Sequence, residues 1–339
     1  MPSTLAPPPV RPKKRRRGTA AVKVQPLPKP ATTEATPAKS AGDREVLAQA
    51  FDKSQFRWNN VDWTVAIFMG AVHVGALAAP FFFSWAALGV CLVLHWLTAS
   101  IGICLGYHRY LAHRSLKLAK PVEFAAMALG TISGEGTPLV WSATHRMHHQ
   151  KSDQEGDPHS PLEGTFWSHL WWLFVGRSKH VEQILLKRYV PELLDRPMMR
   201  FFEKTQALWL FGTGAMLTAA GWFFGGPFGA VSFLLWGFCM RLVLAYHSTW
   251  FVNSATHLWG YRNYKTRDES RNLWWVAILA YGEGWHNNHH AHPTVAPAGH
   301  RWWEIDITWW AIKALRFCGL AWDVNDRIPD KGAAAADHE

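Results

Sequence analysis

Two long stretches without charged residues set the main limit on how this chain can fold. From Trp63 to His108 there is no Asp, Glu, Lys or Arg in 46 residues, and from Thr205 to Tyr261 Arg241 is the only one in 57. About 20 apolar residues are enough to cross a bilayer. Each stretch therefore predicts two membrane-spanning helices joined by a tight turn.

Glycine and proline mark where these turns fall. They interrupt the first stretch near Ala79-Pro80 and the second at Gly225-Gly226-Pro227, and such residues favour hairpin turns. A charged residue inside a span is costly in lipid, so Arg241 is expected to face the bundle interior or to reach the membrane surface. The four predicted spans are residues 62–83, 85–106, 206–224 and 229–250.

The distribution of lysine and arginine orients the predicted spans. Of the 35 Lys and Arg residues, 12 precede residue 63, 13 lie between residues 109 and 204, and 9 follow residue 261. The two predicted outer turns carry none, so the positive-inside rule places both termini and every cationic segment in the cytoplasm. The net charge of +10 follows from this topology, which is a better explanation than nucleic-acid binding.

Composition divides the chain into three parts. Residues 1–50 are rich in Pro, Ala, Thr and Lys and include a basic run at residues 13–17. This segment lacks the apolar core of a signal peptide and is predicted to be a disordered tail near anionic lipid. Residues 51–325 are predicted to form the membrane domain, and residues 326–339 a flexible tail. The cysteines have no CxxC spacing and are expected to be reduced core residues: Cys91, Cys104, Cys239 and Cys318.

Two further helices are expected outside the spans. Residues 123–141 are moderately apolar but contain three glycines and Pro138, which predicts a helix that lies in the membrane interface or covers the functional site. Residues 302–318 alternate tryptophan pairs with charges, a pattern typical of an amphipathic interfacial helix. The 21 tryptophans of the chain suit membrane borders, where the ring is apolar and the N–H finds a partner.

Eight of the 18 histidines occur in three clusters just beyond the apolar stretches, as HRYLAH, HRMHH and HNNHH. Neutral imidazole is the commonest metal ligand, and residues three or four apart share one face of a helix. Eight rings exceed the roughly four to six ligands of a single ion, so the pattern predicts two metal ions close together. The eight residues are His108, His113, His145, His148, His149, His286, His289 and His290. Nine isolated histidines are interpreted as core or solvated residues: His73, His95, His159, His169, His180, His247, His292, His300 and His338.

Four segments in a fixed order resemble the membrane-bound fatty acid desaturases: GYHRYLAHRS, WSATHRMHHQKSDQEGDPHSPLEG, NSATHLWG and GEGWHNNHHAHP. The resemblance is to the group that includes stearoyl-CoA desaturase and the Δ9 acyl-lipid and acyl-CoA enzymes of bacteria and plants, and it covers about residues 60–325. It implies two iron ions held by nine histidines and by a water that an asparagine orients. The ninth histidine matches His257 and the asparagine matches Asn253. Their i, i+4 spacing independently allows both to face one site.

The resemblance also implies a fold and a reaction. The expected fold is all-α, with four transmembrane helices in two hairpins and a cytoplasmic helical cap that carries the di-iron site. The expected reaction uses O2 and two electrons to introduce a cis double bond, at Δ9, into a saturated acyl chain. Trp141 and Thr249 match residues that line a bend in the substrate tunnel, although this chain has Glu135 where relatives commonly carry Gln. Carboxylates near the histidines are expected to orient the rings: Glu283 first, then Asp157, Asp153 and Asp268.

Partners and competing functions complete the sequence-based expectations. The chain has no HPGG haem segment and no ferredoxin-type cysteine spacing, so electrons are expected from a separate protein, ferredoxin or cytochrome b5, on the cytoplasmic face. The acyl carrier, lipid or CoA, remains open. A hydroxylase or alkane monooxygenase on the same scaffold is the first alternative. A metal transporter is the second, but transporters place their ligands near the bilayer midplane, whereas these histidines lie outside the spans.

Overall fold

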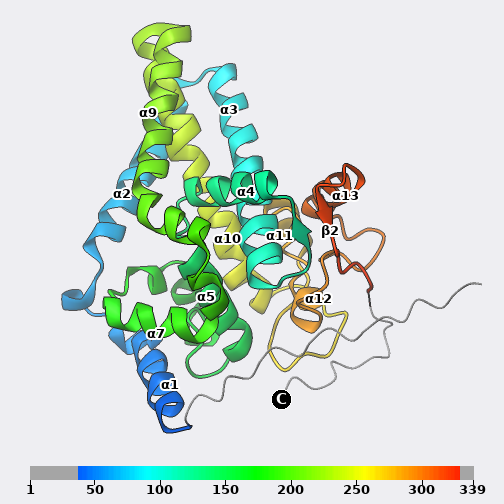
Figure 1. Ribbon diagram of the computed structural model, residues 1–339. Coiled ribbons are helices and arrows are strands. Elements are labelled where there is room, and N and C mark those ends of the chain that lie inside the picture. Colours follow the sequence, from blue (N-terminus) through cyan, green and yellow to red (C-terminus); the bar gives the residue numbers. More distant parts are fainter. Residues whose placement is uncertain (1–36, 329–339) are drawn as a thin grey trace, which may run out of the picture. The chain divides into compact units, whose positions relative to one another are not determined.

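Helices account for nearly all regular structure in residues 37–328, the part of the chain that the computed structural model describes (Figure 1). The one described sheet pairs β1 (Lys117–Leu118) antiparallel with β2 (Ala321–Trp322). The expectation of a helical fold is therefore confirmed. The α-helices are α1 Pro37–Phe51, α2 Trp63–Ala78, α3 Trp85–His95, α4 Lys120–Ile132, α5 Pro138–Lys151, α6 Thr165–His169, α7 Lys179–Tyr189, α8 Pro191–Leu194, α9 Pro197–Phe233, α10 Arg241–Leu258, α11 Trp274–Leu279, α12 His286–Ala291 and α13 Ile307–Phe317.

Helices of other types complete the helical structure. Two π-helices continue α-helices, and the 3-10 helices are single turns at element junctions. The π-helices are η4 Trp96–Ala112 and η7 Leu234–Met240, and the 3-10 helices are η1 Lys53–Gln55, η2 Trp58–Asn60, η3 Ala79–Phe82, η5 Pro161–Glu163 and η6 Trp171–Phe174.

Three helical segments are long and apolar enough to cross a membrane: Trp63–Phe82, Trp85–Ala112 and Pro197–Leu258. The third has non-helical backbone at Gly225 and Gly226, where the sequence predicts a turn. A side chain on Gly221 would collide with the carbonyl of Gly229. Residues eight apart in a straight helix are about 12 Å apart, so this contact requires the chain to reverse direction at the two glycines.

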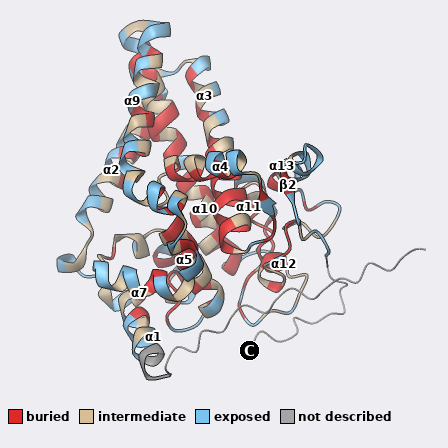
Figure 2. Ribbon diagram, in the orientation of Figure 1, coloured by how far each residue is buried: buried red, intermediate tan, exposed pale blue. Residues whose placement is uncertain are grey.

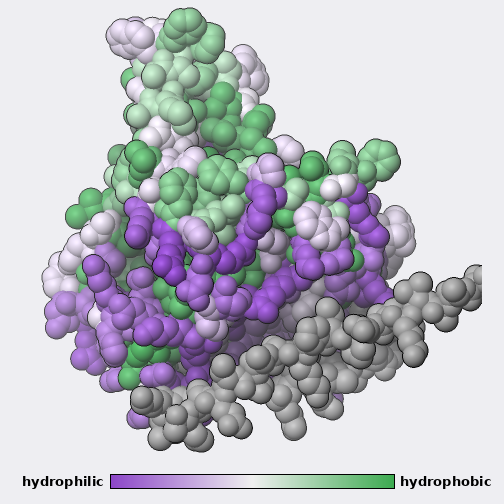
Figure 3. Space-filling view, in the orientation of Figure 1, coloured by the Kyte–Doolittle hydropathy of each residue, from purple (hydrophilic) through white to green (hydrophobic). Residues whose placement is uncertain are grey.

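The ends of these helices expose large aromatic side chains. Phe81 and Trp85 lie at the first turn, Phe223 and Phe224 lie at the second, and all four are at least 78% exposed. The part of the molecule where α3 and α9 project is hydrophobic, whereas the opposite end is mostly hydrophilic (Figure 3). Buried residues concentrate instead around α5, α10 and α12 (Figure 2). This division is what a chain with one end in lipid and one in water requires.

Arg241 lies fully buried within the third apolar segment. Its guanidinium donates hydrogen bonds to the carbonyls of Ile132, at the end of α4, and of Gly237. The carbonyl end of a helix carries partial negative charge, so α4 compensates the buried cation. The expectation that Arg241 faces the bundle interior is confirmed.

Residues 123–141 form two helices rather than one, so that prediction is wrong. α4 ends at Ile132 and α5 begins at Pro138. Between them Gly134 and Gly136 adopt positive φ angles of 77° and 111°, a conformation that glycine reaches without strain. The amphipathic helix expected at 302–318 also starts later, at Ile307, because Asp306 caps its first turn.

The predicted disorder of residues 1–50 is wrong for its last part. Helix α1 runs to Phe51, and the side chains of Leu47 and Phe51 are only 1% exposed in the main hydrophobic core. Two apolar residues four apart share one helix face, a signal that the polar composition of the segment hid. The basic run at residues 13–17 and His338 lie outside the described residues.

The cysteines are all free, but Cys318 is exposed, unlike the other three.

Candidate metal centre

The nine histidines singled out in the sequence gather into two groups. In each group the ligand nitrogens all lie within 4.8 Å of one another. The five-histidine cluster consists of His108, His113, His145, His149 and His289. The four-histidine cluster consists of His148, His257, His286 and His290.

Helix geometry explains how the two HxxHH segments divide between the clusters. On an α-helix, residue i+4 lies about 40° from residue i, whereas residue i+3 lies about 60° away on the other side. In α5, His145 and His149 (i, i+4) therefore face the five-histidine cluster and His148 faces the other. In α12 the assignment is reversed, because His286 and His290 join the four-histidine cluster. Each helix thus supplies ligands to both clusters.

Carboxylates stand behind four of the rings. The Nδ1 atoms of His148 and His257 lie 2.9 Å from Asp157 and Asp153, that of His290 lies 2.7 Å from Asp268, and that of His108 lies 2.9 Å from Glu283. An Nδ1–H donated to a carboxylate leaves the Nε2 lone pair free and fixes the orientation of the ring. These four carboxylates are the ones that the sequence singled out.

Burial sets the protonation state of most of these groups. It lowers the pKa of several rings well below 6.5, and the neighbouring imidazoles lower it further: His113, His145, His149, His286 and His289. Burial alone would raise the pKa of Glu283, but Arg109 and His108 outweigh it and lower the value to about 2. These five rings are therefore neutral and Glu283 is ionised, which is the state that binds a cation. At His148 burial would lower the pKa, but Asp157 outweighs burial and raises the value above 6.5.

The orientation of the free nitrogens fits metal ions between the rings. The Nε2 atoms of His108 and His289 lie 3.0 Å apart, and those of His257 and His286 lie 3.1 Å apart. His257 gives its Nδ1–H to Asp153, so its Nε2 atom carries a lone pair that points at another ring. His108 Nδ1 faces the carboxylate of Glu283, and its Nε2 likewise points at another ring. The Nε2 atoms of His148 and His290 are buried without a hydrogen-bond partner among the described residues. One cation in each cluster would satisfy these nitrogens.

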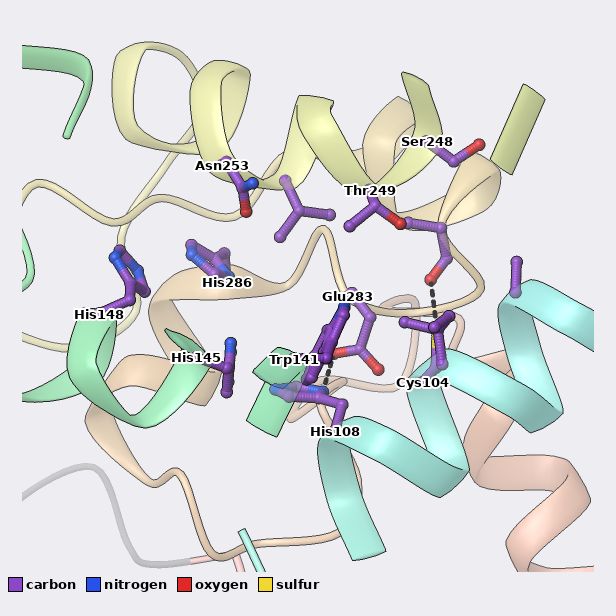
Figure 4. Close-up of a pocket in the computed structure, with 14 residues that line it drawn as sticks. Cys104, His108, Trp141, His145, His148, Ser248, Thr249, Asn253, Glu283 and His286 are labelled. Atoms are coloured by element: carbon purple, nitrogen blue, oxygen red, sulfur yellow. Dashed lines mark hydrogen bonds and ion pairs between the residues drawn. The ribbon is translucent and has the colours of Figure 1, made fainter. Parts of the chain in front are cut away.

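Two cavities meet beside the clusters. One, of about 40 Å³, runs between η4 and α10 and is mainly apolar, and its wall includes His108, His145, His148 and His286. In Figure 4, Asn253 and Thr249 of α10 lie opposite Trp141 and His108. The other cavity, of about 370 Å³, is lined by α2, α9, α10 and η6. The residues common to both walls are Trp141, His145, Thr249 and Asn253.

Glu135 joins the two tunnel residues expected from the sequence. Its carboxylate accepts hydrogen bonds from Thr249 Oγ1 at 2.9 Å and from Trp141 Nε1 at 3.3 Å. Trp141 also stacks on His145, with ring centroids 5.0 Å apart. One carboxylate therefore fixes the tryptophan, the threonine and, indirectly, the face of a cluster histidine.

Sequence reasoning missed the residues that hold α12 in place. Asn288, between two cluster histidines, is fully buried and donates hydrogen bonds to Ala298 O and Glu304 Oε2. Glu304 also accepts from Tyr261 and Asn263. The two asparagines of HNNHH were a visible signal, since adjacent amides inside a buried helix need partners. Glu304 stands in no motif with the histidines, so the sequence carried no signal for its role.

His159 was also interpreted too simply. Its ring lies 4.3 Å from that of His148 between centroids, and its backbone N–H donates to Asp157. It therefore supports the four-histidine cluster from behind rather than acting as an isolated core residue. The triad of His148, Asp157 and His159 could itself offer three ligand atoms, but His148 and Asp157 already serve that cluster.

Long apolar helices joined to buried, all-histidine donor sets define an integral membrane metalloprotein. Comparison with known proteins identifies the group: residues 83–320 match the family model described as fatty acid desaturase. The chain belongs to the fatty acid desaturase family and is an oxidoreductase.

Individual relatives agree over most of their length. The chain is 45% identical over 276 residues to an sn-2 palmitoyl-lipid 9-desaturase of Nostoc sp. (strain 36), covering 81% of this chain and 92% of the relative. It is 41% identical over 274 residues to an sn-1 stearoyl-lipid 9-desaturase of Anabaena variabilis, with 80% and 96% covered. It is also 41% identical over 269 residues to an acyl-CoA 5-desaturase of Anemone leveillei, with 79% and 81% covered.

Proposed function

We propose that this desaturase introduces a cis double bond at Δ9 into a saturated acyl chain carried by a membrane lipid, using O2 and two electrons. The observation that carries the proposal is the junction of two cavities at Trp141, Thr249 and Asn253, beside both histidine clusters. The two cyanobacterial relatives are named as 9-desaturases of lipid-linked chains, whereas the Anemone relative is named for acyl-CoA and position 5. The former are covered more fully, at 92% and 96% against 81%, and the Nostoc relative is also more identical, which favours Δ9 and a lipid carrier.

The proposed cofactor is a pair of iron ions. The five-histidine cluster would hold one ion and the four-histidine cluster the other, with Asn253 orienting a water beside them. Iron with O2 supplies an oxidant strong enough to remove hydrogen from an unactivated methylene group. Neutral nitrogen donors suit iron but do not exclude other transition metals, so the identity of the metal is part of the proposal.

The remaining residues position the rings and the chain. Asp153, Asp157, Asp268 and Glu283 would hold each Nδ1–H and keep Nε2 directed at the metal. The bridge from Trp141 through Glu135 to Thr249 would fix the wall where the two cavities meet. An acyl chain seated along the apolar walls would exclude water from the reacting carbons.

The proposed topology has four spans in two hairpins, with the second hairpin turning at Gly225 and Gly226. Both termini and the metal centre would lie in the cytoplasm. The membrane domain predicted at residues 51–325 would also include the end of α1, because Leu47 is buried in the main core, and residues 326–339 would form a tail. Electrons would reach the centre from a separate protein on that side, ferredoxin or cytochrome b5. The basis for the orientation is the charge distribution, because the proposed outer turns carry no Lys or Arg.

Expression in a host that lacks its own Δ9 desaturase tests this function. We expect a new cis-Δ9 monounsaturated chain that appears first in a membrane lipid class rather than in the acyl-CoA pool. His148→Ala, expressed to the same level, is the inactive control. A hydroxylated product would identify an oxygenase instead, and a double bond formed first on acyl-CoA would contradict the proposed carrier.

A further inference from the structure

A buried arginine lies directly behind one of the cluster histidines. Arg109, next to His108, is 2% exposed and donates hydrogen bonds from Nε and Nη2 to Glu283 Oε1, at 3.1 and 2.9 Å. The other oxygen of Glu283 contacts His108 Nδ1 at 2.9 Å. Arg109 is therefore connected to a candidate metal ligand through a single carboxylate.

A second carboxylate binds the other side of this arginine. Asp306 receives hydrogen bonds from Arg109 Nη1 at 2.9 Å and from Nη2 at 3.1 Å, and it is 3% exposed. Two buried carboxylates thus share one guanidinium. The close approach of Asp306 requires Gly282, since any side chain there would collide with it, and Gly282 has a φ of +121°.

Asp306 also begins helix α13. Its Oδ1 accepts the backbone N–H of Trp309 at 2.8 Å, which caps the first turn, and its Oδ2 accepts that of Ala298 at 2.7 Å. The same turn is fixed to η4 by a hydrogen bond of 2.9 Å between the hydroxyls of Thr308 and Ser100. The start of α13 is thus attached to the helix that carries His108.

The outer face of α13 carries large aromatic side chains beside the exposed cations Lys313 and Arg316. Trp310 is 53% exposed and Phe317 is 92% exposed, whereas Thr308 and Ile312 are fully buried. Figure 1 shows α13 at the edge of the molecule. Such a helix suits the membrane surface, so Asp306 lies between a surface helix and the metal centre.

We propose that Asp306 is a positioning residue that ties α13 to His108 through Arg109 and Glu283. Because Asp306 takes up part of the charge of Arg109, Glu283 keeps net negative charge for the ring of His108. Without the Asp306 charge, Arg109 would neutralise Glu283 fully and draw it away from that ring. The inference rests on the proposed two-iron centre.

Asp306→Asn tests the inference, and Asp62→Asn is its matched control. Asp62 also caps a helix, α2, by accepting the N–H groups of Thr64 and Val65 at 3.0 and 3.1 Å, and neither of these hydrogen bonds involves a cluster residue. Both variants and the wild-type protein would be purified with iron bound, and the rate at which each protein releases iron to a chelator would be measured. We expect Asp306→Asn to release one of its two irons roughly tenfold faster, at the lower end of the effects of outer residues on metal affinity.

The Mössbauer spectrum separates positioning from general damage. One of the two iron signals should change in Asp306→Asn, and neither should change in Asp62→Asn. Arg109→Lys keeps the charge but loses the paired hydrogen bonds, so it should also speed the release of one iron and change one Mössbauer signal. If Asp306→Asn does not fold, Arg109→Lys tests the inference in its place.

The possible failures are distinguishable. Wild-type protein that holds fewer than two irons would contradict the proposed function before any variant is compared. Wild type with two irons, together with Asp306→Asn and Arg109→Lys variants that release both at the wild-type rate, would contradict only the role of Asp306. If Asp306→Asn released both irons faster by the same factor, Asp306 would act only as the cap of α13. That result would also contradict its role as a positioning residue for His108.

Discussion

The two histidine clusters lie side by side but are supported differently. Behind the five-histidine cluster, Glu283 contacts one ring and shares its charge with Arg109. Behind the four-histidine cluster, three carboxylates each contact a ring, and among the described residues none of them forms a salt bridge with Lys or Arg: Asp153, Asp157 and Asp268. The cluster with fewer rings therefore has more negative charge.

This difference has a physical consequence for metal binding. A carboxylate that accepts a ring N–H makes the other nitrogen a stronger ligand, and uncompensated negative charge attracts a cation at short range. The four-histidine cluster would thus bind its ion with fewer but stronger donors. In the five-histidine cluster, metal binding would depend on the larger number of rings. It would also depend on Arg109 and Asp306, which set how much negative charge Glu283 presents to His108.

The largest effect is expected from removing a ring of the four-histidine cluster. His257→Ala should abolish double-bond formation as completely as His148→Ala, because only three rings would remain, and iron should fall from two towards one per chain. Fatty-acid analysis and metal analysis would measure these effects, with the exposed His180→Ala as control. Wild-type double-bond formation in His257→Ala would show that NSATH is only a packed helix end.

Removing one supporting charge should have the next largest effect. Asp268→Asn should weaken iron binding in the four-histidine cluster by about 10–100-fold, while the other ion stays bound. Burial would raise the pKa of Asp268, but His290 and two nearby hydroxyls lower it below 3.8, so mild acid does not remove its charge and the substitution is needed. Chelator titration would measure the loss. Glu269→Gln, at the exposed neighbouring position, should bind both irons normally, and equal behaviour of the two variants would contradict the comparison.

Asn253→Ala should change turnover without emptying either cluster. If Asn253 orients a water, both irons should remain largely bound while the rate falls by about 10–100-fold. Iron per chain and product formation would be measured together, with Ser248→Ala in the same cavity wall as control. Loss of one iron would instead make Asn253 necessary for binding, and an unchanged rate would remove it from the site.

The sequence was sufficient to predict the apolar helices and which histidines gather in the structure, with His257 added by the resemblance to the family. Charge-free length alone indicates spans, and HxxHH spacing alone indicates several rings on one helix. The angular spacing of residues on an α-helix could also have predicted that His145 and His149 face one cluster and His148 the other. The sequence could not show which cluster each pair would join, because that depends on how α5 and α12 face each other.

Contacts between distant segments had no signal in the sequence. Arg109 and Asp306 are 197 residues apart, and either could have been a solvated charge. Helix α1 was missed for another reason: Leu47 and Phe51 bury against the core although their segment is mostly polar. Local composition describes how a segment behaves alone, whereas burial depends on the surface that it meets.

The smallest expected effect concerns Glu135, a carboxylate that holds Trp141 beside the five-histidine cluster. Burial raises the pKa of Glu135 to about 7, although hydrogen bonds from Thr249 and Trp141 oppose it. Between pH 4.5 and 7 the unfolded chain loses this proton while the folded chain keeps it, so stability falls as the pH rises through this window. Glu135→Gln, which is neutral throughout, should melt at a higher temperature than wild type at pH 8 and at the same temperature at pH 4.5. Thermal unfolding in detergent would measure this, with the exposed Glu155→Gln as control. If the melting temperatures of Glu135→Gln and wild type differed by the same amount at both pH values, Glu135 would contribute through packing alone. The five-histidine cluster would then gain no charge from Glu135 above pH 7.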